Sequence, residues 1–274
     1  MVDRGPQQLP SHSVGPLLQY WRKARHLSQL ALATEADVSP RHVCFLETGR
    51  AKPSREMVLL LASVLEVPLR ERNVLLLAAG FAPIYSEASL EAPELGPVRA
   101  ALDAILSQQE PYPAVVMSRS WDILKTNGAA ERFFTHLLGA APRGSANVIR
   151  MILDPQGLRP FVANWEEVAE GLIHRVQREA VGGSRDDVTS KLLESLLSYP
   201  DVRARLGKPL EAPLLPVIPV RFRKGNDTFS FFSTVTTLGT PQDITLQEIR
   251  IECFFPADPE TVRLAKGLAA SSAS

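Results

Sequence analysis

Residues 27–54 read LSQLALATEADVSPRHVCFLETGRAKPS, and this stretch decides the fold of the N-terminal part of the chain. Ser28 and Ser39 are good N-caps, and each precedes a short run with apolar residues at helical spacing. Pro40 stands at the first position of the second run, where the missing N–H costs nothing. The stretch therefore predicts two short helices joined by a tight turn at Asp37.

Further helices are expected on both sides of this pair. Apolar spacing predicts a helix before it, from Val14 to about Leu27, and two after it, over 54–65 and 68–80. Gly49 is placed to end the second helix of the pair. No part of this region has the alternation of a strand, so an all-α bundle is expected.

The charge of the same region points to its partner. The whole chain has no net charge, but residues 22–55 carry seven basic side chains against three acidic ones. A local excess of positive charge favours a polyanionic partner for that segment. A helix-turn-helix needs a short first helix, a tight turn and a capped second helix with polar residues at its start. Residues 28–48 supply each of these parts.

The run Leu27-Ser-Gln-x-x-Leu-Ala, then Val38-Ser39, then Val43-x-x-Leu-Glu-x-Gly-Arg-x-x-Pro-Ser resembles the lambda-repressor-like, XRE-type helix-turn-helix. The family usually has Gly where this chain has Asp37, a residue that tolerates the left-handed conformation. The resemblance implies a transcription regulator that reads double-stranded DNA. It also implies a homodimer on a palindromic operator.

Each expected DNA contact has a physical role and an alternative. Arg41 is expected to read guanine bidentately, His42 to meet a base edge or a phosphate, and Phe45 to contact a thymine methyl. Ordinary solvated surface is the alternative for the first two, and core packing for the third. Glu47 cannot favour phosphate, so a structural tie to a neighbouring arginine is expected. The full set of expected DNA-contacting residues is Gln29, Ser39, Pro40, Arg41, His42, Phe45, Arg50, Lys52 and Ser54.

A second domain follows a change of composition. Pro83, Pro93, Pro97 and three glutamates indicate a linker over 83–97, after the DNA-binding domain at 14–82. Beyond it the pattern reads helix, two strands, helices, three strands and a closing helix. This order predicts an α/β (α+β) domain with an antiparallel sheet over 98–274. The expected strands are 113–118, 121–126, 217–222, 228–237 and 246–254.

The chain beyond the helix-turn-helix resembles the MmyB-like subgroup of these regulators. The similarity lies in Pro53-Ser-Arg-Glu-Met-Val-Leu, Pro68-Leu-Arg-Glu-Arg-Asn and Pro113-Ala-x-Val-x-x-Arg-x-Trp-Asp-Ile-Leu-x-x-Asn, and it weakens after about residue 170. In that subgroup a PAS-like domain binds a ligand, and the resemblance implies a fatty acid or similar lipophilic molecule. Plain core packing is the alternative role for the expected lining residues, which are Val115, Met117, Trp121, Ile123, Phe133, Phe134, Phe161, Trp165, Phe222, Phe229 and Phe231.

Several other classes of function lack support. The five histidines and two cysteines form no metal spacing, and no Gly-rich phosphate loop or Gly-x-Ser-x-Gly elbow occurs. Neither a metal, a cofactor nor a catalytic residue is therefore expected. Cys44 and Cys253 are expected to be buried free thiols.

The expected location is the cytoplasm. Residues 1–13 are polar, read as a disordered or extended arm, and lack the apolar core of a signal peptide. No apolar run approaches the ~20 residues that a membrane span needs. Two other interpretations of the C-terminal domain stay open. A ligand-free dimerisation or protein-interaction module would have a solid core, and a small catalytic domain would have a polar cavity with converging titratable groups.

Overall fold

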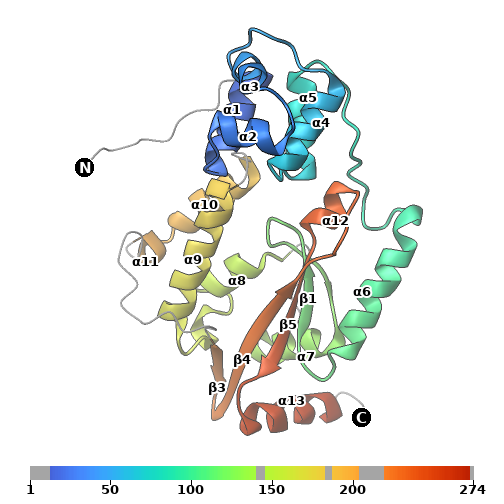
Figure 1. Cartoon of the computed structure of the whole chain (residues 1–274). Helices are drawn as coiled ribbons and strands as arrows, with labels where there is room; N and C mark the ends of the chain where they lie inside the picture. Colours follow the sequence, from blue (N-terminus) through green and yellow to red (C-terminus); the bar gives the residue numbers. More distant parts are fainter. Residues whose placement is uncertain (1–12, 140–145, 183–186, 204–218, 272–274) are drawn as a thin grey trace. The chain divides into compact units, whose positions relative to one another are not determined.

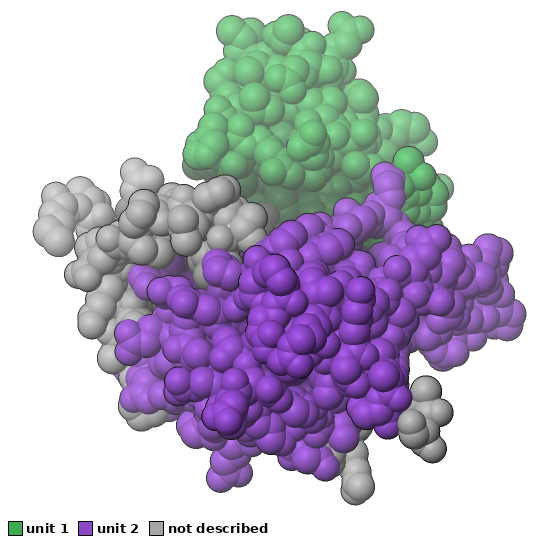
Figure 2. Space-filling model, turned by 90° about the horizontal axis from the view of Figure 1, so that it is seen from below, with its two compact units in different colours: residues 1–87, 182–185, 240–247 green, residues 88–181, 186–239, 248–274 purple. Residues whose placement is uncertain are grey.

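The structure, a computed structural model, divides into two compact units, which are coloured separately in Figure 2. The N-terminal unit comprises residues 1–87, 182–185 and 240–247, and the C-terminal unit comprises residues 88–181, 186–239 and 248–274. The arm expected at 1–13 lies, apart from Ser13, outside the described residues. The described residues are 13–139, 146–182, 187–203 and 219–271.

The N-terminal unit is a bundle of short helices, as expected (Figure 1). Its core is apolar and contains side chains from every helix of the bundle, among them Trp21, Leu32, Val43, Leu61 and Leu75. The helices are α1 (Val14–Ala24), α2 (Gln29–Glu35), α3 (Pro40–Glu47), α4 (Arg55–Val64) and α5 (Leu69–Ala78).

Serine caps set the starts of three of these helices. The side chains of Ser28, Ser39 and Ser54 each accept a hydrogen bond from the backbone N–H three residues on, at 3.0, 3.1 and 3.2 Å. Asp37 adopts φ +52° in the turn between α2 and α3, and Gly49 adopts φ +73° after α3. The caps, the left-handed turn and the glycine stop are thus confirmed.

One side chain of α2 is placed differently from its expected position. The sequence has apolar residues at positions 30, 32 and 33, which predicts that all three face the core, but Leu30 is 64% exposed. The buried face of this short helix consists of Leu32 and Ala33. A helix of seven residues makes only about two turns, so few of its side chains can reach the core.

Close packing of α1 against the end of α3 depends on a glycine. A Cβ atom at Gly15 would lie 2.6 Å from the carbonyl oxygens of both Leu46 and Glu47. No other residue type fits at that distance without movement of the backbone. Gly15 therefore allows α1 to approach the last turn of α3, where the buried ion pair described below forms.

The N-terminal unit also includes a segment from late in the sequence. Residues 240–247, which join two strands of the C-terminal unit, belong to the N-terminal unit. The Leu69 N–H donates to Gln247 Oε1 at 2.7 Å, and the Ser86 hydroxyl donates to Asp243 Oδ2 at 2.7 Å. Gln247 thus satisfies an N–H at the start of α5, where the N-cap residue is a proline and offers no side-chain cap. We call residues 240–247 the return segment.

An antiparallel sheet forms the centre of the C-terminal unit, as expected. Its strands run in the order β2-β1-β5-β4-β3, and all neighbouring pairs are antiparallel. Opposed residues share a face, so Val115, Glu252 and Val235 lie on one side of the sheet. The strands are β1 (Ala114–Met117), β2 (Ile123–Thr126), β3 (Val220–Lys224), β4 (Asp227–Thr236) and β5 (Arg250–Pro256).

Helices α7, α8 and α9 contribute to one apolar core with this face of the sheet. The Asn127 side chain caps α7, because it accepts a hydrogen bond from the Ala130 N–H at 2.9 Å. The helices and 3-10 turns of this unit are η1 (Pro93–Leu95), α6 (Gly96–Gln108), α7 (Gly128–Leu138), α8 (Val148–Leu153), η2 (Arg159–Phe161), α9 (Trp165–Gly182), α10 (Asp187–Leu197), α11 (Pro200–Arg203) and α13 (Pro259–Ser271).

One expected boundary is wrong. The strand expected over 246–254 begins only at Arg250, because its first residues form α12 (Ile244–Glu248). Asp243 starts that helix by accepting hydrogen bonds from Leu246 and Gln247, a cap signal that the apolar pattern masked. Within the linker expected over 83–97, Pro93–Leu95 form η1 and α6 begins at Gly96.

Candidate functional site

Helix α3 presents polar side chains at its start. Arg41 is exposed and His42 is half-buried. Ser39 is exposed, but its hydroxyl oxygen already caps the helix through the His42 N–H. The helix thus begins with an ordered backbone and an exposed guanidinium, as direct reading of base edges requires. The other exposed members of the expected set are Pro40, Arg50, Lys52 and Ser54.

An aromatic ring on this helix lies close to two arginines, one on the helix and one just after it. The guanidinium carbon of Arg41 lies 5.1 Å from the centre of the Phe45 ring, and that of Arg50 lies 5.9 Å from it. Both distances are within the range of a cation–π attraction. Phe45 is half-buried, so it is not simply a core residue. The Phe45 ring therefore keeps the positive charges of Arg41 and Arg50 close to α3.

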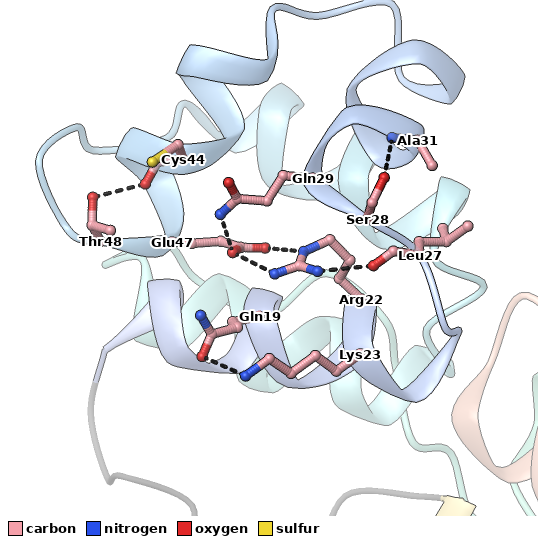
Figure 3. Close-up of polar contacts among 10 residues, drawn as sticks. All are labelled: Gln19, Arg22, Lys23, Leu27, Ser28, Gln29, Ala31, Cys44, Glu47 and Thr48. Atoms are coloured by element: carbon pink, nitrogen blue, oxygen red, sulfur yellow. Dashed lines mark hydrogen bonds and ion pairs between the residues drawn. The ribbon is translucent and has the colours of Figure 1, made fainter.

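A buried ion pair anchors the other end of α3 (Figure 3). Arg22 Nε donates to Glu47 Oε1 at 2.6 Å and Arg22 Nη2 donates to Glu47 Oε2 at 2.8 Å. The two side chains are only 10% and 1% exposed. Burial raises the pKa of Glu47, but the hydrogen bonds from Arg22 and Gln29 outweigh it and hold the pKa below its ordinary value. The expected tie between Glu47 and an arginine is confirmed.

Gln29 is part of the same network. Its side-chain amide donates to Glu47 Oε2 at 2.7 Å (Figure 3). An amide nitrogen has two hydrogens, so one remains for a phosphate oxygen. The first helix of the motif is therefore linked to the C-terminal end of α3 by a side chain that the sequence assigned to DNA.

The C-terminal unit contains an apolar cavity of about 430 Å³. Its walls come from the sheet and from helices α7, α8 and α9. This volume lies within the range of small-molecule sites, which are mostly apolar with few polar groups. The lining residues are Pro113, Val115, Trp121, Phe133, Phe134, Val148, Met151, Ile152, Leu158, Val168, Gly171, Leu172, Arg175, Val220, Phe222, Ser233, Glu252 and Phe254.

The structure brings some of the expected lining residues together at this cavity and places others elsewhere. Those that line it are Val115, Trp121, Phe133, Phe134 and Phe222. The others, Met117, Ile123, Phe161, Trp165, Phe229 and Phe231, pack in or against the same core without lining the cavity.

The cavity has a polar side, formed by residues outside the expected lining set. The Ser233 hydroxyl donates to Glu252 Oε1 at 2.6 Å. Burial raises the pKa of Glu252, and the Ser233 hydrogen bond and the charge of Arg175 only partly oppose this effect. The guanidinium carbon of Arg175 lies 4.4 Å from the centre of the Trp121 ring. These side chains are the charged or hydroxyl groups in an otherwise apolar lining.

Two sequence signals pointed to this polar side. Glu252 is an acid within the apolar run from Ile251 to Phe255, at the positions that alternate with Ile251 and Cys253. Arg175 follows Val168 by seven residues, which places it on the buried stripe of α9. A charged residue at a position where the apolar pattern predicts a core residue is unusual, and it indicates a buried polar site.

Two other arginines of the C-terminal unit form ion pairs. Arg119 pairs with Glu248 at 2.9 Å and Arg159 pairs with Asp201 at 2.5 Å. Cys44 and Cys253 are free thiols, but both are half-buried rather than fully buried. Within the described residues, no group of three metal-binding side chains occurs. No helix in the described part of the chain is long and apolar enough to cross a bilayer.

The chain is similar to two known protein families. A family model described as the MmyB-like transcription regulator ligand binding domain matches residues 98–268, and one described as Helix-turn-helix matches residues 18–72. A search of curated proteins finds no match. The helix-turn-helix match contains helix α3, and the ligand-binding-domain match contains every residue that lines the apolar cavity.

Proposed function

Since the chain belongs to the family of MmyB-like transcription regulators, we propose that a small lipophilic, fatty-acid-like ligand in its cavity controls how it binds DNA. DNA binding itself follows from the helix-turn-helix. The observation that carries the proposal is the apolar cavity of about 430 Å³ between the sheet and its helices. A ligand-free interaction module would have a filled interior, so the cavity favours the ligand.

We propose further that the protein acts as a homodimer on a palindromic operator. Two recognition helices would then lie about 34–36 Å apart, or a multiple of this distance. Val74 and Leu77 support the dimer, because they are 41% and 59% exposed and lie three residues apart on α5. Apolar side chains at this spacing share one face of a helix and can meet the same face of a second copy.

The C-terminal unit acts in this proposal as a PAS-like sensor and not as an enzyme. The strand order β2-β1-β5-β4-β3, with helices over one face, supports this interpretation. The ligand controls DNA binding only if it binds the DNA-binding and the non-binding states with different affinity. We place this action in the cytoplasm, where the operator DNA is.

Native mass spectrometry of the purified protein tests both the ligand and the dimer. Compared with the denatured mass, the native mass should show two chains and about one lipophilic molecule per chain, which a solvent extract then identifies. Leu172 lines the cavity, so Leu172→Trp places an indole inside it. This variant should copurify without the lipophilic molecule, and it should still bind DNA. Leu124→Trp is the control, since Leu124 is exposed on β2.

Either part of this proposal can fail separately. Apo protein, together with no thermal shift from a panel of lipids, would reject the ligand and leave the interaction module. A native mass of one chain at concentrations that saturate the operator would reject the dimer. Retention of the copurifying molecule by Leu172→Trp would show that it binds outside the cavity.

Arg41→Ala is expected to weaken operator binding by about 1–3 kcal/mol and to relax the preference at one base pair. The reason is that Arg41 is exposed at the start of α3, where a bidentate contact to guanine can form. Selection of binding sites from a random DNA library measures the change. Arg55→Ala is the control, because Arg55 is exposed at the start of α4. An unchanged preferred site in Arg41→Ala would reject the assignment.

A further inference from the structure

The return segment connects two strands that line the cavity, although it belongs to the unit that binds DNA. We propose that this segment transmits the occupancy of the cavity to the helix-turn-helix. The inference rests on the proposed function, because it states how a ligand in the cavity changes the affinity for DNA. It assigns this role to contacts at the two ends of α12.

Helix α12 is fastened to the N-terminal unit near both of its ends. Just before its start, Asp243 Oδ2 accepts a hydrogen bond from the Ser86 hydroxyl at 2.7 Å. Near its end, Gln247 Oε1 accepts one from the Leu69 N–H at 2.7 Å. Since α12 has only five residues, its own backbone hydrogen bonds are too few to hold it as an independent helix. Its position therefore depends on these contacts.

The residue that follows is tied to the wall of the cavity. Glu248 comes directly after Gln247, and its Oε1 accepts from Arg119 Nη1 at 2.9 Å. The two side chains of this pair are only 22% and 18% exposed, so salt screens their attraction less than that of an exposed pair. Arg119 lies in the turn between β1 and β2, two residues before Trp121, which lines the cavity. One peptide bond thus joins the residue that contacts α5 to a residue that contacts this turn.

The strands on either side of the return segment also reach the cavity. The guanidinium carbon of Arg250, the first residue of β5, lies 5.2 Å from the centre of the Trp121 ring, within the range of a cation–π attraction. Further along β5, Glu252 lines the cavity and accepts a hydrogen bond from Ser233 of β4 at 2.6 Å. A ligand that displaces the Trp121 ring or this hydrogen-bonded pair therefore acts on both strands that the segment connects.

The turn that carries Trp121 is suited to two conformations. Trp121 adopts φ +68°, which is unfavourable for a residue with a large side chain. Such a conformation persists only where the surrounding contacts hold it. Here these contacts include the pair of Arg119 with Glu248 and the guanidinium of Arg250 at the ring. A ligand against the Trp121 ring changes this balance, and the Glu248 end of the return segment responds to it.

The two states differ at the start of α5. In one state Gln247 accepts from the Leu69 N–H, and in the other this N–H loses its acceptor, because the N-cap residue Pro68 offers no side-chain cap. Helix α5 shares a core with the recognition helix, since Leu75 of α5 and Val43 of α3 belong to the same apolar cluster. A change at the start of α5 therefore alters how firmly α3 is held for DNA.

Operator binding by the full-length, delipidated protein, with and without saturating dodecanoate, tests the inference. The two operator affinities of the wild type should differ by about 5–150-fold, the usual range of coupling between sites. Gln247→Ala removes the acceptor of the Leu69 N–H, and Glu248→Ala removes the partner of Arg119. Each should reduce the ratio to less than about twofold. Both should still bind dodecanoate in titration calorimetry, because neither residue lines the cavity.

Two matched variants should keep the coupling. Gln247→Glu retains an oxygen acceptor at the start of α5, where a negative charge is also favourable. Glu87→Ala removes an ion pair with Arg70 in the same unit, next to Ser86 but outside the return segment. Hydrogen exchange in the peptides of α5 gives a second readout. It should respond to dodecanoate in the wild type and in these two variants, and not in Gln247→Ala or Glu248→Ala.

Loss of coupling in both alanine variants at 247 and 248, with dodecanoate still bound and with coupling kept in Gln247→Glu and Glu87→Ala, supports the inference. Coupling that persists in either Gln247→Ala or Glu248→Ala would overturn it and leave a ligand-controlled regulator intact. Loss of coupling in Gln247→Glu or Glu87→Ala, or loss of dodecanoate binding in the alanine variants, would overturn it as well. If dodecanoate does not bind the wild type, or binds without changing its operator affinity, the proposed function itself fails.

Discussion

Glu47→Ala is expected to lower the free energy of unfolding of the N-terminal unit by about 3–5 kcal/mol. The substitution leaves the Arg22 guanidinium buried without its partner, and this uncompensated charge is the main cost. Glu47 is also the acceptor for the Gln29 amide. Because the pair lies at the end of α3, operator affinity should fall with stability.

Hydrogen exchange measured by mass spectrometry across a urea series resolves this loss in the peptides of α1 to α3. Glu35→Ala is the matched control, because Glu35 is exposed on α2 and should change stability by less than about 0.5 kcal/mol. The double variant Arg22→Met with Glu47→Leu removes both charges and should recover most of the loss. A double variant as unstable as Glu47→Ala would show that the cost does not come from the unpaired charge.

Phe133→Ala is expected to lower the free energy of unfolding of the C-terminal unit by about 3–5 kcal/mol. The Phe133 ring is 4% exposed and makes edge-to-face contacts with Phe222, Phe229 and Phe231 at centroid distances of 5.1, 5.3 and 5.5 Å. Its loss removes one ring from three such pairs at once. It also enlarges the cavity that this ring lines.

The same exchange measurement, in the peptides of α7 and β4, reports this loss. Phe232→Ala is the control on the adjacent residue, since Phe232 is half-buried and stacks on Phe255 with the ring centres 5.4 Å apart. It should cost clearly less, because a partly exposed ring has less buried area to lose. Equal losses in the two variants would reject the central role of Phe133.

The N-terminal unit could be predicted closely because its determinants are local. Ser28, Ser39 and Ser54 cap helices through a backbone group three residues away, so a short window of sequence contains the whole interaction. The turn at Asp37 depends on the conformation of one residue. Glu47 was also informative. Its negative charge cannot favour a contact with phosphate, so a structural role could be predicted for it.

The cavity could not be predicted in the same way. Its polar side joins Arg175 on α9, Ser233 on β4 and Glu252 on β5, and their spacing in the chain says nothing of their meeting in space. Aromatic patterns identified core positions correctly but could not separate Phe222, which lines the cavity, from Phe229, which packs beside it. That difference depends on how the helices pack against the sheet, and this packing is set by contacts between residues far apart in the sequence.

The return segment has a consequence for how such proteins can exchange domains. A recombination at the linker, near residue 87, would carry α1 to α5 away but leave Asp243 and Gln247 behind. The transplanted helices would then lack the partners of Ser86 and of the N–H of Leu69. A working chimaera must therefore inherit two separate pieces of gene, or a receiving domain whose own loop offers equivalent acceptors. The helices that bind DNA thus depend on a segment that lies, in the sequence, between two strands of the C-terminal unit.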